Sequence, residues 1–517
     1  VLRFSNWPAP PALILSDPNY NEPPGSFLKL AFPGYLLFFS TYTMRNSNSA
    51  TLKSGSIWTI IKTALRGEEQ DYTNGSIRRA VFLLAIPMVI EMGMESVFAI
   101  VDLYFVGQLP DSQHNIQTVG LTESVLSLVY AMAIGVSMAA TAMVARRVGE
   151  KDKKGAAHAA MQSLLVGIGI AVAVSIIGLI LAPDILRWMG AEPETVRIGT
   201  PYTRLMMGTS LVITLLFLIN GIFRGAGDAS MAMKSLMIAN IANILLCPIL
   251  ILGWGPIPGM GLIGAALATT IGRGIGVCYQ LYYLFRGNTM VNLRLASWLP
   301  DWKVIRSLFK VAAPGTAQFI IGSCSWIFLA KLVAETGHSA ASAGYQTAIR
   351  IMVFFILPAW GMSNAAATLV GQNLGARKPD RAVQSVYATA RYNAIFMGVV
   401  MLVFFAAAEW VVGFFTHEPE VKRIGTQALQ IMSAGFIFYG IGMVMANAFN
   451  GAGDTKTPTR INLVGFWFFQ IPLAYILSKP LGLGPLGVFI AIPVAETSIT
   501  IAAWLLFLKG RWKDVVI

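Results

Sequence analysis

Charge is scarce in this chain. Charged residues make up only 12% of its 517 residues, whereas hydrophobic residues make up 55%. Soluble globular domains carry about 25% charged residues, so this composition excludes an ordinary soluble protein. The chain is also rich in Gly, with 49 residues, as expected where membrane helices pack closely through small side chains.

Residues that build redox, metal and nucleotide sites are also few. The three cysteines, Cys247, Cys278 and Cys324, lie in predicted membrane spans without CxxC spacing, and the four histidines are scattered. These patterns predict neither a disulfide framework nor a metal site. The chain has no GxxxxGK[ST] run, which excludes P-loop ATP hydrolysis, and no nucleophile–base pair that would support a membrane enzyme. We therefore expect no cofactor and no enzymatic activity.

Twelve long apolar runs follow Arg79 and predict an all-α integral membrane protein. They lie at about 80–107, 119–145, 157–182, 198–222, 230–254, 261–285, 304–331, 342–369, 384–409, 424–448, 458–478 and 486–509. A helix needs about 20 apolar residues to cross a bilayer, so each run is a candidate transmembrane helix. Six runs fall in each half of the chain.

The chain repeats itself at a constant offset of 226 residues. Glu192–Glu194 returns as Glu418–Glu420, and Gly225–Asp228 returns as Gly451–Asp454. In each copy the glycines suit a left-handed helix end and the aspartate suits an N-cap, so we interpret these motifs as structural. An internal parallel repeat in a membrane protein is typical of transporters, in which a pseudo-two-fold axis along the membrane normal relates two lobes.

The repeat divides the chain into three regions. Residues 76–301 form an amino-terminal six-helix lobe, and residues 302–517 form a carboxy-terminal six-helix lobe. Residues 1–75 are an N-terminal tail that we expect to be disordered. Within it, residues 1–43 precede the first methionine and are either a dispensable tail or an over-extended gene model. Residues 56–66 have the pattern of an amphipathic helix on the inner membrane surface, with plain disorder as the alternative.

The net charge of +13 is unevenly distributed. Lys and Arg cluster in alternate loops, whereas the intervening loops 108–118, 253–260 and 335–341 carry none. This positive-inside bias places both termini in the cytoplasm and argues against nucleic acid as a partner. We expect a multi-pass protein of a bacterial inner (plasma) membrane, with the lipid bilayer around it.

Several motifs, in this order, resemble the multidrug and toxic compound extrusion (MATE) family: Val101–Asp102, Phe105–Gly107, the turn Arg224–Asp228 and the helix holding Asn243 and Pro248. The resemblance covers about 79–510 and is closer to the DinF-like than to the NorM-like branch. It implies twelve helices in two lobes that open a central cleft alternately to either side. It also implies exchange of protons or sodium ions for cationic and amphiphilic compounds.

The first span carries three acidic residues, Glu91, Glu95 and Asp102. At 100° per residue, Glu95 lies about 40° and Asp102 about 20° from Glu91 around the helix, so the acids form one stripe. An ionisable group in the bilayer costs about 2.5–3.5 kcal/mol, and the stripe must therefore face protein or water. Such carboxylates suit a proton carrier. The alternative is that neighbouring Ser, Asn or Arg groups, with Arg204 and Arg273 as candidates, simply balance them.

The resemblance to the DinF-like branch implies a cation site in the amino-terminal lobe, comprising Asp102, Asn220, Asn243 and either Thr269 or Thr270. That branch usually has Asp before the proline of the fifth span, where this chain has Cys247, a thiol that is neutral near pH 7. Either Glu91 and Glu95 supply the missing charge, or the site is altered. The acids of the NorM-like branch in the seventh and tenth spans are absent, so no sodium site of that type is expected.

These features predict a secondary active multidrug efflux transporter. It would exchange protons, or alternatively sodium ions, for cationic or amphiphilic compounds, and it would act as a monomer on small-molecule substrates. Met92 and Met206 are candidates for an adaptable apolar cavity. Glu496 either pairs with Arg350 across the carboxy-terminal lobe, which we favour, or contacts substrate. A flippase of a lipid-linked saccharide is the alternative within transport, although such proteins favour cationic cavities. A membrane enzyme or receptor is the alternative from another class.

Overall fold

The computed structural model describes residues 57–517, apart from 68–69, 107–108, 110–111 and 287–289. At residues 57, 99–104, 112–113, 116 and 257 it describes secondary structure but not the side chains. The segment 1–43, predicted to be dispensable, lies outside the described residues.

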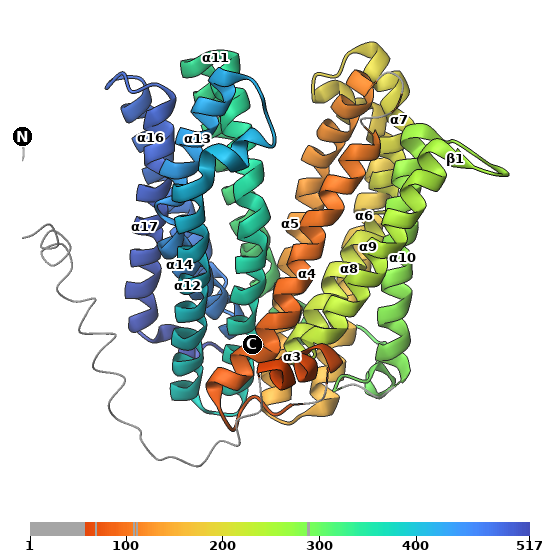
Figure 1. Cartoon of the computed structure of the whole chain (residues 1–517). Coiled ribbons are helices and arrows are strands. Elements are labelled where there is room, and N and C mark those ends of the chain that lie inside the picture. Colours follow the sequence, from red (N-terminus) through yellow and green to blue (C-terminus); the bar gives the residue numbers. More distant parts are fainter. Residues whose placement is uncertain (1–56, 68–69, 107–108, 110–111, 287–289) are drawn as a thin grey trace, which may run out of the picture. The chain divides into compact units, whose positions relative to one another are not determined.

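The described chain is almost entirely helical (Figure 1). Its α-helices are α3 (Ile57–Arg66), α4 (Ile77–Val106), α5 (Ser112–Gly149), α6 (Lys153–Trp188), α7 (Pro193–Gly208), α8 (Ser210–Ala226), α9 (Ala229–Leu252), α10 (Gly261–Arg286), α11 (Trp302–Gly375), α12 (Pro379–Gly413), α13 (Pro419–Ser433), α14 (Phe436–Ala452), α15 (Lys456–Asn462), α16 (Ile471–Ser478) and α17 (Pro485–Leu508). A π-helical stretch, η2 (Leu463–Gln470), joins α15 to α16, and η1 (Leu293–Leu295) and η3 (Arg511–Asp514) are short 3-10 turns. Two short strands, β1 (Gly253–Trp254) and β2 (Ile257–Pro258), form a hairpin.

The described helices account for the twelve predicted spans. Ten are long and apolar enough to cross a membrane, and the pair α13 and α14, bent by 53°, adds an eleventh. Helix α11 supplies one more, because its 74 residues would extend about 110 Å, against about 30 Å for a bilayer core. The break predicted between the seventh and eighth spans, at 335–341, is confirmed, because the backbone turns at His338, with φ 57° and ψ −157°, and separates two helices within α11.

The repeated motifs adopt the same local structure in both copies. Gly227 and Gly453 follow their helices with φ of 89° and 88°, in the left-handed region that favours glycine. The Oδ1 atom of Asp228 then accepts from the backbone N of Met231, and Asp454 does the same for Thr457, both at 3.3 Å. The predicted helix stop is therefore confirmed in both copies and the N-cap is confirmed at Asp228, whereas α15 begins one residue later, after Thr455.

Symmetric contacts join the two repeat units along α5 and α11. Gly149 lies against the backbone of Gln372, and Gly375 lies against the backbone of Arg146. These two contacts are equivalent in the repeat, because Gly375 lies 226 residues after Gly149 and Gln372 lies 226 residues after Arg146. A Cβ atom at either glycine would collide with the opposite helix, so close approach requires glycine here. The reciprocal pair supports the expected pseudo-two-fold relation between the units.

The described segment before the first span, from residue 57 onward, is folded. Helix α3 begins at Ile57, and its Ala64 is buried in an apolar cluster with Tyr72 and Ala80. After it, the backbone N and the hydroxyl of Thr73 donate to Oδ1 of Asp71 at 2.8 and 2.6 Å, which forms a tight turn. Of the two alternatives for residues 56–66, the helix is confirmed over Ile57–Arg66. The disorder expected for the rest of the tail is wrong for residues 70–75, because this segment buries apolar side chains and satisfies its polar groups locally.

Candidate functional site

The acid Glu91 lies on α4 and is buried, with 1% of its surface exposed. Its Oε1 accepts from Nδ2 of Asn220 at 3.0 Å and lies 3.5 Å from Nη1 of Arg224. Both partners come from α8, where a spacing of four residues places them on one face. Oε2 of Glu91 is buried without a hydrogen-bond partner. The structure thus brings two predicted site residues together, and adds an arginine that sequence reasoning had assigned only to a turn.

A polar network orients Asn220. Its Oδ1 accepts from the hydroxyl of Ser235 at 3.1 Å and from Nε2 of Gln280 at 2.6 Å. With its oxygen so occupied, the amide presents its NH₂ group to Glu91. Ser235 and Gln280 were missed by the sequence analysis. The sequence did offer one signal for this network, since each of these uncharged polar residues lies in a largely apolar helix, Ser235 in α9 and Gln280 in α10.

The second acid, Glu95, pairs with Arg273 on α10, with Oε1 and Nη2 3.2 Å apart. Nη1 of Arg273 donates to the hydroxyl of Tyr130 at 2.5 Å. The guanidinium also lies over the rings of Phe98 and Tyr130, at 5.1 and 5.5 Å. Of the two arginines proposed to balance the stripe, Arg273 therefore does so, whereas Arg204 donates to the carbonyl of Leu179.

The remaining predicted polar residues form further contacts in the same unit. Nδ2 of Asn243 donates to the hydroxyl of Thr269 at 3.1 Å, and the thiol of Cys247 lies 3.6 Å from Oδ1 of Asn243. Thr270 instead shares a 3.1 Å hydrogen bond with Thr209. Asp102 lies on α4, but its side chain is outside the described residues. The cation-coupling role of this set stays a prediction.

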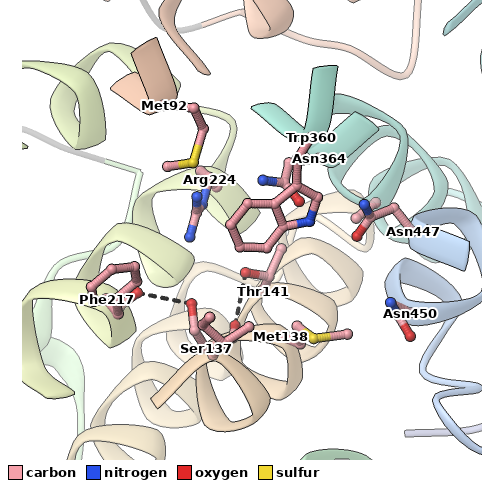
Figure 2. A pocket seen from close by; sticks show the side chains of 12 residues that line it. Met92, Ser137, Met138, Thr141, Phe217, Arg224, Trp360, Asn364, Asn447 and Asn450 are labelled. Atoms are coloured by element: carbon pink, nitrogen blue, oxygen red, sulfur yellow. Dashed lines mark hydrogen bonds between the residues drawn. The ribbon is translucent and has the colours of Figure 1, made fainter. Parts of the chain in front are cut away.

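A pocket of about 520 Å³ lies between the two repeat units (Figure 2). Its polar side chains are Ser137, Thr141, Arg224, Asn364, Asn447 and Asn450. Met92, predicted to line a cavity, does so, and Trp360 of the second unit also lines it. Met206, the other predicted methionine, packs in an apolar cluster with Tyr202 and Ile213. Arg224 thus faces the pocket while contacting Glu91 behind it.

A smaller pocket, of about 270 Å³, lies inside the second unit and includes Glu496 of α17. Glu496 is 7% exposed, whereas Arg350 is on an exposed face of α11. The favoured pairing of these two residues is wrong, since it is absent from the ion pairs of the described residues.

A known protein family matches each of the two repeat units separately. The family model MatE matches residues 87–249 and again 314–476. The two matches cover more than half of the chain, and each begins at a proline, Pro87 or Pro314, inside one repeat unit.

Similar proteins are named as bacterial multidrug resistance or multidrug export proteins. The probable multidrug resistance protein NorM of Thermotoga maritima is 26% identical over 437 residues, which cover 84% of this chain and 93% of that protein. The multidrug export protein MepA of Staphylococcus aureus is 23% identical over 435 residues, covering 84% and 94%.

Solved structures share the fold over most of the chain. One, described as the outward-facing conformation of a multidrug resistance MATE family transporter, has a TM-score of 0.80 at 26% identity and covers 86% of this chain and 98% of its own. With the family model matched in both halves, the chain belongs to the multidrug and toxic compound extrusion (MATE) family, whose members are multi-pass membrane transporters rather than enzymes.

Proposed function

We propose that this protein is a multidrug efflux antiporter that exchanges protons for cationic or amphiphilic compounds. The observation that carries the proposal is the contact between Glu91 and Arg224. Arg224 lines the pocket between the two units, and Glu91 lies behind it with one carboxylate oxygen unpartnered. Arg224 therefore contacts both the proposed proton-binding group, Glu91, and the proposed substrate cavity.

Protonation of Glu91 changes the electrostatics of the pocket. The ionised carboxylate compensates the charge of Arg224, and proton binding at Oε2 removes that compensation. An uncompensated positive charge disfavours a cationic substrate in the pocket, so proton entry and substrate release are coupled. In the reverse step, proton loss restores the ion pair and lets a cation bind. This is differential stabilisation of two states by one ligand, as exchange requires.

Protons fit the Glu91 surroundings better than sodium ions. Hard metal cations require several oxygen ligands. The groups that approach Oε1 of Glu91 are an amide NH₂ and a guanidinium, which donate hydrogens and repel a metal cation. A proton needs a single lone pair, and Oε2 offers one.

The orientation of the protein in the membrane is proposed from the charges at one end of the units. The basic loop after α5 and the turn after α11 support assigning this end to the cytoplasm. Here the hydroxyl of Thr368 donates to the carbonyl of Arg224 at 2.9 Å, and Nε2 of Gln372 donates to that of Gly225 at 3.0 Å. Contacts that close the cytoplasmic end support an outward-facing state in a bacterial inner membrane, with both termini in the cytoplasm.

The lining of the central pocket bears on the substrate class and on the flippase alternative. Arg224 is its one charged residue among the described lining side chains, and Glu91 opposes that charge. Pyrophosphate-linked lipids call for several cations, so this lining does not favour a flippase. Trp360, Phe217 and two methionines offer apolar and aromatic contacts suited to amphiphilic compounds. We also propose that the protein belongs to the DinF-like branch of the family and that it acts as a monomer.

Transport by purified protein in proteoliposomes tests this function. An acidic lumen at equal sodium concentration should drive ethidium uptake by wild-type protein, because protons leave as the dye enters. Glu91→Gln should abolish this uptake. Glu409→Gln, a change at an exposed residue of the second unit, is the matched control and should transport normally. Dye uptake that follows a sodium gradient and ignores the pH gradient would refute proton exchange.

A further inference from the structure

The pocket around Glu496 has no counter-charge of its own. Glu496 is more than nine-tenths buried, and none of the described residues donates a hydrogen bond to it or forms an ion pair with it. An ionised carboxylate in such surroundings costs several kcal/mol, so this group either binds a proton or is accompanied by a cation. The pocket beside it, about 270 Å³ when its open side is included, is narrow and is lined by Trp326, Phe436 and Tyr439.

The internal repeat identifies the position equivalent to Glu496. The loop before the last helix is three residues shorter in the second unit, so the offset falls from 226 to 223 there. Gly261 and Gly484 then coincide, with φ of 55° and 58°. Gly264 and Gly487 also coincide, since each lies against the end of the preceding membrane helix, at Leu250 and Leu477 respectively. By this alignment Glu496 occupies the place of Arg273.

The first unit shows what this position holds. There the guanidinium of Arg273 fills the site, paired with Glu95 and covered by the rings of Phe98 and Tyr130. The first unit therefore supplies both the cation and its carboxylate from its own chain.

The second unit keeps the acidic and aromatic character but supplies no cation. An offset of 226 places Ile356 where Tyr130 stands, and Ile356 lines the pocket. The carboxylate now projects from α17 itself, at the place of the arginine. Pocket residues also include Gly435, at the bend of 53° between α13 and α14. Interrupted membrane helices of this kind border binding sites in transporters.

We propose that this pocket is a second binding site, which takes a small organic monocation of the amidinium or guanidinium type. A planar cation pairs with a carboxylate through two parallel hydrogen bonds, and its face stacks on aromatic rings. A metal ion fits poorly, because no group of three or more acidic, His or Cys residues occurs among the described residues. The site lies within one unit, apart from the pocket between the units.

Binding of 4-fluorobenzamidinium to full-length protein in lipid nanodiscs, followed by fluorine NMR, tests the site. Binding requires no ion gradient, so the result stands apart from the proposed export. Wild-type protein should bind this cation and should bind neutral 4-fluorobenzamide at least ten-fold more weakly. Glu496→Gln should weaken amidinium binding at least ten-fold, whereas the exposed control Glu409→Gln should leave it unchanged.

A second pair of variants separates loss of charge from loss of fold. Glu496→Arg places a guanidinium where Arg273 stands in the first unit, and should abolish binding while the protein stays monodisperse. Trp326→Leu keeps an apolar side chain but removes the aromatic face, and should weaken binding several-fold. Amidinium binding that is unchanged by Glu496→Gln and by Trp326→Leu, or absent from wild-type protein, overturns the proposal.

Discussion

The hydroxyl of Tyr72 donates to the carbonyl of Gly227 at 3.2 Å, across 155 residues of chain. Burial raises the pKa of Tyr72, so the hydroxyl remains a donor at all physiological pH values. On the other side of the same segment, Arg381 of α12 donates to the carbonyls of Tyr72, Asn74 and Gly75. The segment Asp71–Gly75 thus connects the two repeat units at the end that we assign to the cytoplasm.

Loss of this connection should lower the thermal stability of the protein. Tyr72→Phe removes one hydrogen bond, worth about 0.5–1.5 kcal/mol, and Arg381→Gln removes charge-assisted bonds worth more. We expect a lower melting temperature in detergent for both variants, with the larger decrease for Arg381→Gln. Lys62→Gln, on an exposed face of α3, is the control and should melt like wild type. Identical melting of all four proteins would contradict the connecting role.

Asp102→Asn should abolish drug-coupled transport without affecting insertion or folding. Asp102 lies on the helix face shared with Glu91 and at a position implied by the family resemblance, and an amide cannot release a proton. Ethidium efflux from cells that express equal amounts of variant and wild-type protein measures the effect. Wild-type efflux by the variant would show that Asp102 carries no coupling ion.

Glu91 and Arg224 should be energetically coupled. Breaking a buried ion pair by removing one partner costs about 3–5 kcal/mol, because the other charge stays buried. Arg224→Gln should therefore be strongly destabilising. The double variant with Glu91→Gln should lose less than the sum of the two single losses, by about 0.5–3 kcal/mol. Unfolding in mixed micelles gives all three values, and strict additivity would mean that the 3.5 Å contact contributes nothing.

Asp301 should make stability depend on acidity below about pH 4. A hydrogen bond from His158, followed by one from the backbone N of Lys303, holds the pKa of Asp301 below its usual value. A carboxyl group whose pKa is lower in the folded than in the unfolded state stabilises the fold at pH values above its unfolded-state pKa. This stabilisation is lost as the pH falls through its folded-state pKa. In a plot of melting temperature against pH, Asp301→Asn should reduce the decrease seen at the acidic end. An unchanged decrease would mean that solvent screens these contacts.

Local features of the sequence predicted much of the fold. Apolar run length depends only on neighbouring residues and bilayer thickness, so twelve spans could be counted in advance. The helix stop at Gly227 and the cap at Asp228 are likewise local, because φ preference and side-chain length are properties of single residues. The break at His338 lies inside the predicted loop 335–341, but the residue at which the backbone turns could not be predicted, since histidine carries no comparable signal for a left-handed backbone.

The candidate site could be predicted only in part. Helical periodicity placed Glu91 and Glu95 on one interior-facing stripe, as the structure shows. It could not identify the partners, because Asn220 lies 129 residues from Glu91 along the chain and Gln280 lies on yet another helix. The pairing was settled by how α4, α8 and α10 pack.

The sequence by itself determined the membrane class, the duplication and the ends of the repeated helices, because these follow from composition, periodicity and short-range steric preferences. The tertiary structure alone decided which charges meet. Arg273 finds Glu95 in the first unit, whereas Glu496 at the equivalent position meets no cation among the described residues. Two copies of one unit can share every local rule and still differ here, since an ion pair depends on residues brought together from separate helices.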